Sequence, residues 1–398
     1  MNTTPAVSAE ELRDQMVDRI LGSQHLAPRV EAALRRVERH RYVPDASLVD
    51  AYDERAIITH TFPDGTHLSC ASGPSIVAGM LNALDVQPGH RVLEIGAGTG
   101  YNAALLATLA AGGQVTTIDI NADVAAAARR NLDATGYPDV RVITRDGAEG
   151  AAEYGPYDRI IVTVGAWDIP PAWWEQLVPG GRLVVPLRWR GTTRALGLTK
   201  RHDHWDCDWI FLCGFVPMLG QPGEHSMAID LDGTVILHYD IDQPIDIAAL
   251  QKVLTRQRSA VWSDTTVESD EPFDRIWLRL SAAHDGTARI EAREPAVTSG
   301  LCTPAIASRS PALVEGDSLA YFTIRRHQKT PGRWQLGAIG HGPRGHHLAT
   351  QIVDHITVWD QDRTADPRLI AYPSATPLPP TATGKIITKP HTRLVLRY

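Results

Sequence analysis

A glycine-rich turn between an apolar run and a helical pattern constrains the fold of this chain more than any other feature. The run Arg91–Ile95 is followed by Gly96, Gly98 and Gly100, and helical spacing resumes at Tyr101. Glycines at such a turn let the backbone bend sharply and approach a ligand where a Cβ would collide. A helix that begins directly after them offers free N–H groups and the positive end of its dipole. The pattern predicts a ligand site at the carboxyl end of a buried strand.

Strand and helix patterns alternate beyond this turn. Further strands are expected at residues 114–120, 140–144, 158–164 and 181–186, with helices at residues 101–109, 122–132 and 171–177. This rhythm is typical of a parallel sheet covered by helices on both faces. We therefore expect an α/β fold in which residues 1–222 form a doubly wound, Rossmann-like sheet, preceded by helices within residues 8–40.

Two of the expected strands are followed by a carboxylate. Asp119 lies at the end of the strand after the glycine turn, and Asp146 follows the next strand. Ligands of open α/β sheets bind at the carboxyl ends of strands, where a carboxylate such as Asp119 can accept hydrogen bonds from both hydroxyls of a ribose. Asp146 and Gly147 are placed to meet an adenine ring. The Gly-x-Gly-x-Gly spacing departs from the Gly-x-Gly-x-x-Gly of dinucleotide sites.

Glu94, the glycine turn, Asp119 and Asp146, in this order, resemble the class I S-adenosylmethionine-dependent methyltransferases. The resemblance implies S-adenosylmethionine as the cofactor. The residues expected to bind it are Glu94, Gly96, Gly98, Gly100, Asp119, Ile120, Asp146 and Gly147. The alternative is an α/β domain whose glycines only make turns.

Short motifs on both sides of the turn narrow the resemblance. Arg41-Tyr-Val-Pro44, Ala51-Tyr-Asp53, the loop Ser72-Gly-Pro-Ser75 and Phe215-Val-Pro217 resemble, in this order, the protein-L-isoaspartyl O-methyltransferase family over about residues 10–220. The resemblance implies that Ser72 contacts the substrate carboxylate beside the methyl donor, as a catalytic and substrate-binding residue. Gly73 and Ser75 are expected to bind substrate as well, although the family often carries other residues at these two positions.

Residues 223–398 have a different pattern. Strand patterns dominate, for example at residues 234–239, 273–280 and 334–339, with two helical segments between them. We expect an α+β extension. Its segments at residues 262–263, 336–343 and 387–392 resemble extended family members found with ribosomally synthesised, modified peptides (RiPP) of the lanthipeptide, graspetide, lasso and FxLD types. That resemblance implies recognition of a cyclised precursor peptide, in which an Asp is methylated and the ester collapses to an aspartimide.

Three hypotheses of function follow. The first is this peptide-tailoring carboxyl O-methyltransferase. The second is a general repair methyltransferase for L-isoaspartyl peptides, with an accessory domain. The third is a non-catalytic module that binds S-adenosylmethionine or docks a partner, which the presence of Glu94, Asp119, Asp146 and Ser72 disfavours. A carboxylate acceptor is already anionic at neutral pH, so methyl transfer to it requires no general base.

Composition and charge disfavour other classes of protein. With 39 Lys and Arg against 46 Asp and Glu, the net charge of −7 is unsuited to a duplex nucleic-acid binder. No apolar run is long enough for a membrane span, and the first residues lack a basic and apolar leader, so a cytoplasmic protein is expected. The four cysteines are widely spaced, which favours free thiols.

Two further clusters have more than one interpretation. The segment His202–Cys207 holds metal-ligand residue types but is interpreted as a polar hairpin, and no metal site is expected. Trp167, Trp173 and Trp174 follow the strand at residues 158–164, near the expected opening of the substrate channel. We expect Trp167 to contact substrate, with packing in the core or in a lid as the alternative.

Overall fold

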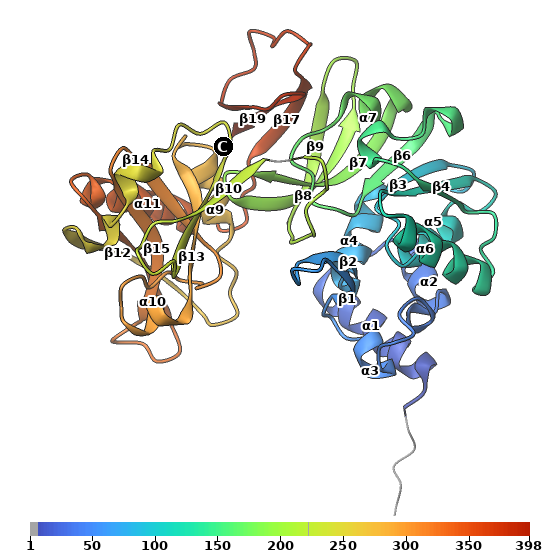
Figure 1. Cartoon of the computed structure of the whole chain (residues 1–398), viewed down its shortest axis with the longest axis horizontal. Coiled ribbons are helices and arrows are strands. Elements are labelled where there is room, and N and C mark those ends of the chain that lie inside the picture. The colour runs from blue at the N-terminus through green and yellow to red at the C-terminus, as the bar shows by residue number, and fades with distance from the viewer. Residues whose placement is uncertain (1–6, 222) are drawn as a thin grey trace, which may run out of the picture.

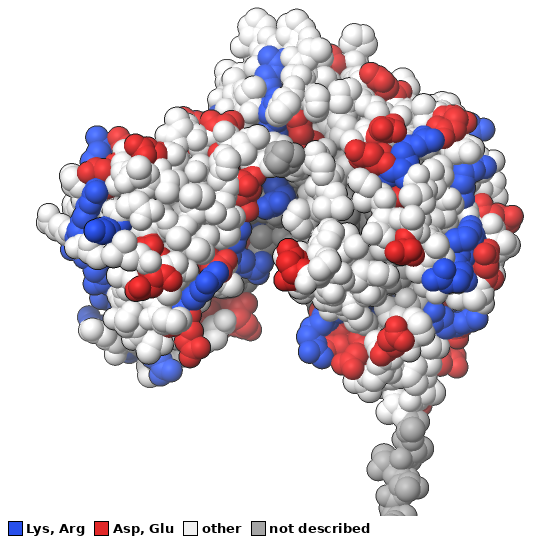
Figure 2. Space-filling model, viewed as in Figure 1, with Lys and Arg blue, Asp and Glu red and all other residues white. Residues whose placement is uncertain are grey.

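The computed structural model describes residues 7–221 and 223–398. Figure 1 shows two lobes joined along one side, the first built largely from the N-terminal half of the chain. A notch separates the lobes on the face shown in Figure 2. Two large sheets organise the lobes, one of ten strands and one of seven.

Helices at the start of the chain pack beneath the first sheet. α1 (Ala9–Ser23) begins at a capping box, in which the Ser8 hydroxyl accepts from the Glu11 N–H and the Glu11 carboxylate accepts from the Ser8 N–H. It is followed by α2 (Pro28–Arg36), a 3-10 turn at Arg39–Tyr42 and α3 (Leu48–Ala51). A hairpin of β1 (Ile57–Thr61) and β2 (His67–Ala71) then leads to α4 (Pro74–Leu84).

The centre of the first sheet is parallel. In spatial order its strands are β7 (Leu177–Trp189), β6 (Tyr157–Val162), β3 (Arg91–Ile95), β4 (Gln114–Asp119) and β5 (Arg141–Thr144). Between them run α5 (Tyr101–Leu109), α6 (Ala122–Ala134) and α7 (Pro171–Gln176). The chain proceeds outward from β3 through β4 to β5 and then returns to the other side of β3 with β6. This reversal opens a crevice at the carboxyl ends of β3 and β6, and it confirms the expected doubly wound fold.

The first sheet continues in antiparallel fashion and is completed by the end of the chain. β8 (Thr192–Lys200) and β9 (Trp205–Leu212) follow β7, and β17 (Arg368–Pro373), β19 (Thr392–Arg397) and β18 (Lys385–Thr388) then add to β9. Ile370 pairs with Asp206, and Ala371 pairs with Trp205. Residues 368–397 therefore belong to the sheet of the first lobe, although they lie far beyond the boundary expected at residue 223.

The second sheet is antiparallel and forms the second lobe. Its spatial order is β10 (Glu224–Ala228), β11 (Val235–Asp240), β13 (Thr287–Ala292), β14 (Ser310–Glu315), β15 (Ser318–Arg326), β16 (Trp334–His341) and β12 (Arg258–Val267). The helical segments α8 (Ile247–Leu250) and α10 (Glu294–Thr298) are short, whereas α11 (Gly345–Gln361) packs Leu348, Ile352 and Ile356 into the core beside β16. The strand expected at residues 273–280 is wrong: the structure has helix α9 (Arg275–Ser281), which buries Ile276 and Leu280 on one side. Burial here overrides the strand preference of its β-branched and aromatic residues.

Buried polar side chains join the two lobes. Arg190, in the turn between β7 and β8, donates to Asp240 at 3.0 Å and to Asp242 at 2.8 Å. The Arg190 contacts fix the second lobe against the end of β7. Within the first lobe, the Lys389 ammonium, between β18 and β19, donates to the Arg188 carbonyl at 2.7 Å and lies over the Trp167 ring. Burial lowers the pKa of Lys389 to about 7.

Two local expectations can be compared with the described residues. His204 contacts the neighbouring Asp203 and Asp206, as expected for a polar hairpin, and no cluster of three or more metal-ligand side chains occurs within residues 7–221 and 223–398. None of the helices described there has both the length and the apolar character needed to cross a bilayer.

Candidate active site

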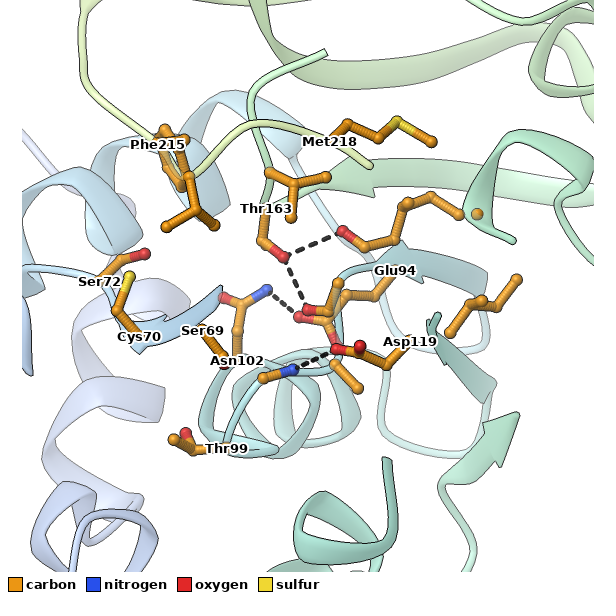
Figure 3. Close-up of a pocket in the computed structure, with 18 of the residues that line it drawn as sticks. Ser69, Cys70, Ser72, Glu94, Thr99, Asn102, Asp119, Thr163, Phe215 and Met218 are labelled. Carbon is orange, nitrogen blue, oxygen red and sulfur yellow. Dashed lines mark hydrogen bonds between the residues drawn. The ribbon is translucent and has the colours of Figure 1, made fainter. Parts of the chain in front are cut away.

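A cavity lies at the carboxyl ends of β3, β4 and β6, in the crevice where the strand order reverses (Figure 3). The glycine turn and the start of α5 form its floor. Its other walls are the end of β2 with the loop that follows, and the segment from Phe215 to Leu219. In Figure 3, Cys70 and Ser72 lie on one side of the cavity and Asp119 on the opposite side.

The glycine turn has a geometry that side chains would disrupt. Gly96 has a φ of +101°, and a Cβ built on it would lie 2.5 Å from the Thr163 hydroxyl oxygen. The Thr163 hydroxyl donates to the carbonyl of Gly96 at 2.7 Å, which closes the turn against the end of β6. Gly98, with a φ of +52°, lines the cavity near the Cys70 carbonyl. Gly100 faces α6 instead. The absence of a side chain there allows close packing against α6, and Gly100 does not line the cavity.

Asp119 stands at the end of β4 with its carboxylate beside the glycine turn. One oxygen accepts from the Gly98 N–H at 3.1 Å, and the other accepts from the Asn121 N–H at 3.0 Å. Burial raises the pKa of Asp119, and these N–H groups oppose that rise. Each carboxylate oxygen can accept more than one hydrogen bond. Asp119 can therefore receive a pair of hydroxyl groups from a ligand without losing its contacts to the turn.

Glu94 forms the base of the cavity and is completely buried. The Asn102 amide donates to one of its oxygens at 2.8 Å, and the Thr117 hydroxyl donates to the other at 2.6 Å. Burial raises the pKa of Glu94 to about 7. This pattern of contacts ties β3, β4 and α5 together beneath the ligand site.

The raised pKa of Glu94 predicts a pH-dependent stability. Between the ordinary pKa of 4.5 and the folded value of about 7, the folded chain retains a proton that the unfolded chain releases. The free energy of unfolding therefore falls as the pH rises through this window. We expect Glu94→Gln to remove this part of the slope, as measured by chemical denaturation at several pH values. An identical slope in both proteins would contradict the assignment.

The far end of the cavity is suited to a flat ring. Asp146 uses one carboxylate oxygen to accept from the Ala148 N–H at 2.9 Å, and it lines the cavity with Gly147. Ile120 also lines the cavity and is 44% exposed, although it is a large apolar residue. A Cβ on Gly147 would lie 2.4 Å from the Ile95 side chain, so only glycine fits there.

Arg39 fixes the loop that carries Ser72. Its guanidinium donates to the carbonyl of Ala51 at 2.8 Å and to that of Ser72 at 2.8 Å. Ser72 lines the cavity immediately before α4, so Arg39 determines where the hydroxyl-bearing residue stands. Arg39 lies within a 3-10 turn remote in sequence from the cavity motifs, and no sequence pattern marks it as a site residue.

Two buried polar atoms at this cavity have no partner among the described residues. They are Nη1 of Arg39 and the hydroxyl of Tyr101, and both side chains line the cavity. The Arg39 guanidinium lies 5.1 Å from the centre of the Tyr101 ring. An unpaired buried charge is strongly destabilising unless a partner of opposite charge meets it. The pair therefore suits the carboxylate of a ligand.

Three predicted substrate-binding residues do not line the cavity. Gly73 and Ser75 follow Ser72 at the start of α4, but Gly73 packs against the Glu54 carbonyl and the Ser75 N–H donates to the Glu54 carboxylate. Trp167 is buried between Gly223 and Lys389 at the junction of the lobes. The remaining predicted site residues, apart from Gly100, do line the cavity.

The doubly wound sheet, the glycine turn at its reversal and the carboxylates at the strand ends define a class I S-adenosylmethionine-dependent methyltransferase. Within that class, the model of the family protein-L-isoaspartate(D-aspartate) O-methyltransferase (PCMT) matches residues 12–222. The chain belongs to the PCMT family. Its cofactor is S-adenosylmethionine.

Individual relatives match about half of this chain. A protein-L-isoaspartate O-methyltransferase of Methanopyrus kandleri is 38% identical over 221 residues, which cover 53% of this chain and 92% of the relative. One from Methanoregula boonei is 41% identical over 222 residues, covering 56% of this chain and 98% of the relative. The family model ends at residue 222, so the second lobe lies beyond its match.

A solved structure extends the similarity to both lobes. It is named protein-L-isoaspartate O-methyltransferase, and it aligns with 92% of this chain and 98% of its own length, with a TM-score of 0.52 and 19% identity. At that identity the similarity concerns the fold. A second lobe of this kind therefore also accompanies a methyltransferase sheet in another chain.

Proposed function

We propose that this chain transfers a methyl group from S-adenosylmethionine to a carboxylate of an isoaspartyl or aspartyl residue in a peptide. The observation that carries the proposal is the cavity, whose lining includes Ser72, Arg39 with its unpaired nitrogen and Tyr101 with its unpaired hydroxyl. In Figure 3, Ser72 lies on the side of the cavity opposite Asp119. The names of the family and of its relatives support the same acceptor.

The residues of the cavity fit the cofactor. We assign Asp119 to the ribose hydroxyls, Ile120, Asp146 and Gly147 to the adenine, and Gly96 and Gly98 to the close approach of the backbone. Glu94 supports these groups from below through Asn102 and Thr117. When bound, S-adenosylmethionine supplies an electrophilic methyl group on a positively charged sulfur.

The chain's part in the reaction is to position the acceptor. A carboxylate is anionic at neutral pH and needs no proton removed. The Ser72 hydroxyl would hold one of its oxygens with a single neutral hydrogen bond, which leaves the other oxygen nucleophilic. Positioning of this kind can lower the activation free energy of a reaction between two bound reactants by up to about 7–11 kcal/mol.

The methyl ester then makes the carbonyl carbon open to attack. The backbone nitrogen of the following residue forms a new bond to this carbon, methanol leaves, and a succinimide remains. This second step requires only that the peptide reach a closed geometry, so it can take place away from the cavity.

We propose that the acceptor residue lies in a constrained, modified precursor peptide, as the extended family members imply. The second lobe lies beyond the residues that the family model matches, and this supports the choice. The other candidate is a general role in repairing isoaspartyl peptides. The solved structure with two lobes is named as a protein-L-isoaspartate O-methyltransferase, so linear isoaspartyl peptides belong in the test.

Mass spectrometry of peptides incubated with the protein and S-adenosylmethionine tests both the proposed methyl transfer and the proposed kind of peptide substrate. The panel consists of unrelated linear isoaspartyl peptides and Asp-containing cyclised precursor peptides. A gain of one methyl group, or a later loss of water that marks a succinimide, on any of them supports the carboxyl methyltransferase. A preference for the cyclised set supports the precursor substrate, and equal use of linear peptides contradicts it. No methylation of either set, with cofactor binding intact, contradicts the acceptor.

Ser72→Ala is expected to lower kcat/KM for the peptide by roughly 10- to 100-fold, because one hydrogen bond to a charged group is lost. Affinity for S-adenosylhomocysteine should not change. Ser75→Ala is the matched control: it removes a hydroxyl three positions along the chain, in the first turn of α4 and outside the cavity, and should leave kcat/KM near the wild-type value. Equal effects of the two substitutions would exclude a specific role for Ser72.

Tyr101→Phe removes the unpaired hydroxyl and leaves the ring in place. We expect about a tenfold loss of affinity for the ligand whose carboxylate it meets. Calorimetry with S-adenosylmethionine and with its decarboxylated form, beside the KM for peptide, identifies that ligand. Tyr42→Phe is the control, because the Tyr42 hydroxyl is already bonded to Thr135 at 2.7 Å. Unchanged binding of both ligands to Tyr101→Phe would exclude the carboxylate contact.

A further inference from the structure

β10 is an exposed edge strand of the second sheet. It pairs with β11 on one side, and no other strand of the described chain pairs with its other side. His225, Ser226 and Met227 are exposed, and Met227 retains 45% of its surface. The pairing is regular from Glu224 to Ala228, without a bulge.

The register shows which main-chain groups of β10 point outward. The Ile241 N–H donates to the Gly223 carbonyl at 3.2 Å, and the Ile229 N–H donates to the Val235 carbonyl at 3.0 Å. Hydrogen-bonded pairs alternate along an antiparallel ladder. The bonded pairs with β11 are therefore those of the odd-numbered residues of this strand, namely residues 223, 225, 227 and 229.

The even-numbered residues of β10 direct their N–H and carbonyl groups away from β11. The Ala228 carbonyl accepts from the Gln251 amide at 3.1 Å. The main-chain groups of Glu224 and Ser226 have no hydrogen-bond partner within residues 7–221 and 223–398. Natural proteins usually protect such an edge with lysine, proline or a bulge. The sequence Glu-His-Ser-Met-Ala contains none of these.

The edge is continuous with the cavity wall. Phe215 to Leu219 line the cavity, and Glu224 begins five positions after Leu219. Five residues span at most roughly 18 Å. Gln221 and Gly223 are fixed to the first lobe, because the Trp167 N–H donates to the Gln221 side chain at 2.9 Å and Gly223 packs on the Trp167 ring. In Figure 1, β10 lies where the two lobes meet.

We infer that the peptide substrate binds in an extended conformation along the open edge of β10, as an additional strand of the second sheet, while its acceptor residue occupies the cavity. Main-chain pairing at a sheet edge is a general mode of peptide recognition and accepts many sequences. Exposed Met227 would contact a side chain of the added strand. This inference rests on the proposed function and specifies how the second lobe would contribute to it.

Peptide length gives the first test. Acceptor peptides with two residues on each side of the target extend at most roughly 7 Å beyond it, whereas an extension of about eight residues on one side spans roughly 26 Å, more than the five residues from Leu219 to Glu224 can span. We expect kcat/KM to rise by at least tenfold on lengthening, for extension on one side only. Methylation of all lengths with equal kcat/KM would overturn the inference and leave the proposed function intact. No methylation at any length, in linear or cyclised form, is instead a failure of the proposed function.

Backbone N-methylation of the long peptide gives a more specific signature. Alternate N–H groups of an added strand face β10, so methylation at every second position should lower kcat/KM by roughly three- to tenfold. The positions between them should have little effect. A loss with this period of two supports strand addition, and uniform or absent losses exclude it. The unmodified enzyme is used throughout, so its folding is not in question.

Ser226→Pro tests whether the main chain of β10 takes part in binding the peptide. It removes an outward N–H and leaves the ladder to β11 unaltered, which proline permits on an edge. We expect it to abolish the advantage of long peptides and to leave activity on short peptides unchanged. Ser226→Ala should retain the advantage, because the N–H remains.

Ala260→Pro is the matched control at the opposite edge. Ala260 is exposed on β12, and the bond from the Gly342 N–H to the Gln257 carbonyl places its own N–H on the outer side of that strand. It should retain the long-peptide advantage. If both proline variants lose it equally, or if Ser226→Pro retains it, β10 does not bind the peptide.

Discussion

Gly96→Ala is expected to weaken binding of S-adenosylhomocysteine by at least about 100-fold and to abolish methyl transfer. The residue has a φ of +101°, which L side chains rarely adopt, and its Cβ would lie 2.5 Å from the Thr163 hydroxyl. The turn must move to relieve this contact, and it would carry Gly98 and the Asp119 carboxylate bonded to it away from the cofactor. Isothermal titration calorimetry measures the loss directly.

Two further variants separate the causes of this loss. Thr163→Ala in combination with Gly96→Ala removes the closest contact and should recover part of the affinity, whereas the strain of φ remains. Gly112→Ala introduces a comparable strain, at φ +81°, where a Cβ meets nothing within 4 Å. It should lower stability slightly and leave the affinity unchanged. Wild-type affinity of Gly96→Ala would contradict the placement of the cofactor at this turn.

Deletion of residues 368–398 is expected to prevent folding of the first lobe, even though the PCMT match ends at residue 222. The deletion removes the buried side chains of Leu369, Ile387, Leu394 and Leu396 from the core of the first sheet. Each contributes about 1.5–3 kcal/mol, so together they rival the roughly 5–15 kcal/mol that stabilise a typical domain. Thermal unfolding monitored by circular dichroism should show loss of the cooperative transition.

A point substitution keeps this prediction testable if the deleted chain aggregates. Leu396→Ala, at 1% exposure, should lower the free energy of unfolding by about 2–5 kcal/mol. Ile386→Ala, on the neighbouring strand at 40% exposure, should change it by less than about 1 kcal/mol. A folded, cofactor-binding chain that ends before residue 368 would show that β17 to β19 are dispensable.

The parallel centre of the fold could be predicted because its signals are local. Apolar runs, helical spacing and the glycine turn each lie within a few residues of one another, and the strand ends then follow from chain order. The return of β17 to β9 could not be predicted, since Ile370 and Asp206 pair across a distance that leaves no local pattern. The helix at Arg275–Ser281 was missed for a related reason: its partners, in α11 and β15, are distant in sequence.

The cofactor side of the site was more predictable than the acceptor side. Asp119 and Asp146 stand at strand ends, which sequence reveals. Arg39 and Tyr101 matter because each has a buried polar atom without a partner, and that is a property of the folded packing. The helical pattern around Tyr101 does not indicate that its hydroxyl lacks a partner. Trp167 was expected at the substrate channel from its position after β6, but its ring is covered by Gly223 and Lys389.

The return of the chain to the first sheet makes the second lobe an insertion with two attachments. The chain leaves the first sheet after β9 and re-enters it at β17, and these two strands are hydrogen-bonded neighbours. A lobe attached through a single linker can swivel about it. This lobe is held at two places, where Gly223 packs on the Trp167 ring and where the chain re-enters the first sheet at β17, so it can turn only if one of these attachments is disrupted. Any ligand that contacts both lobes would therefore bind to two surfaces held at a fixed distance, which limits the lengths and shapes of ligand that can bind.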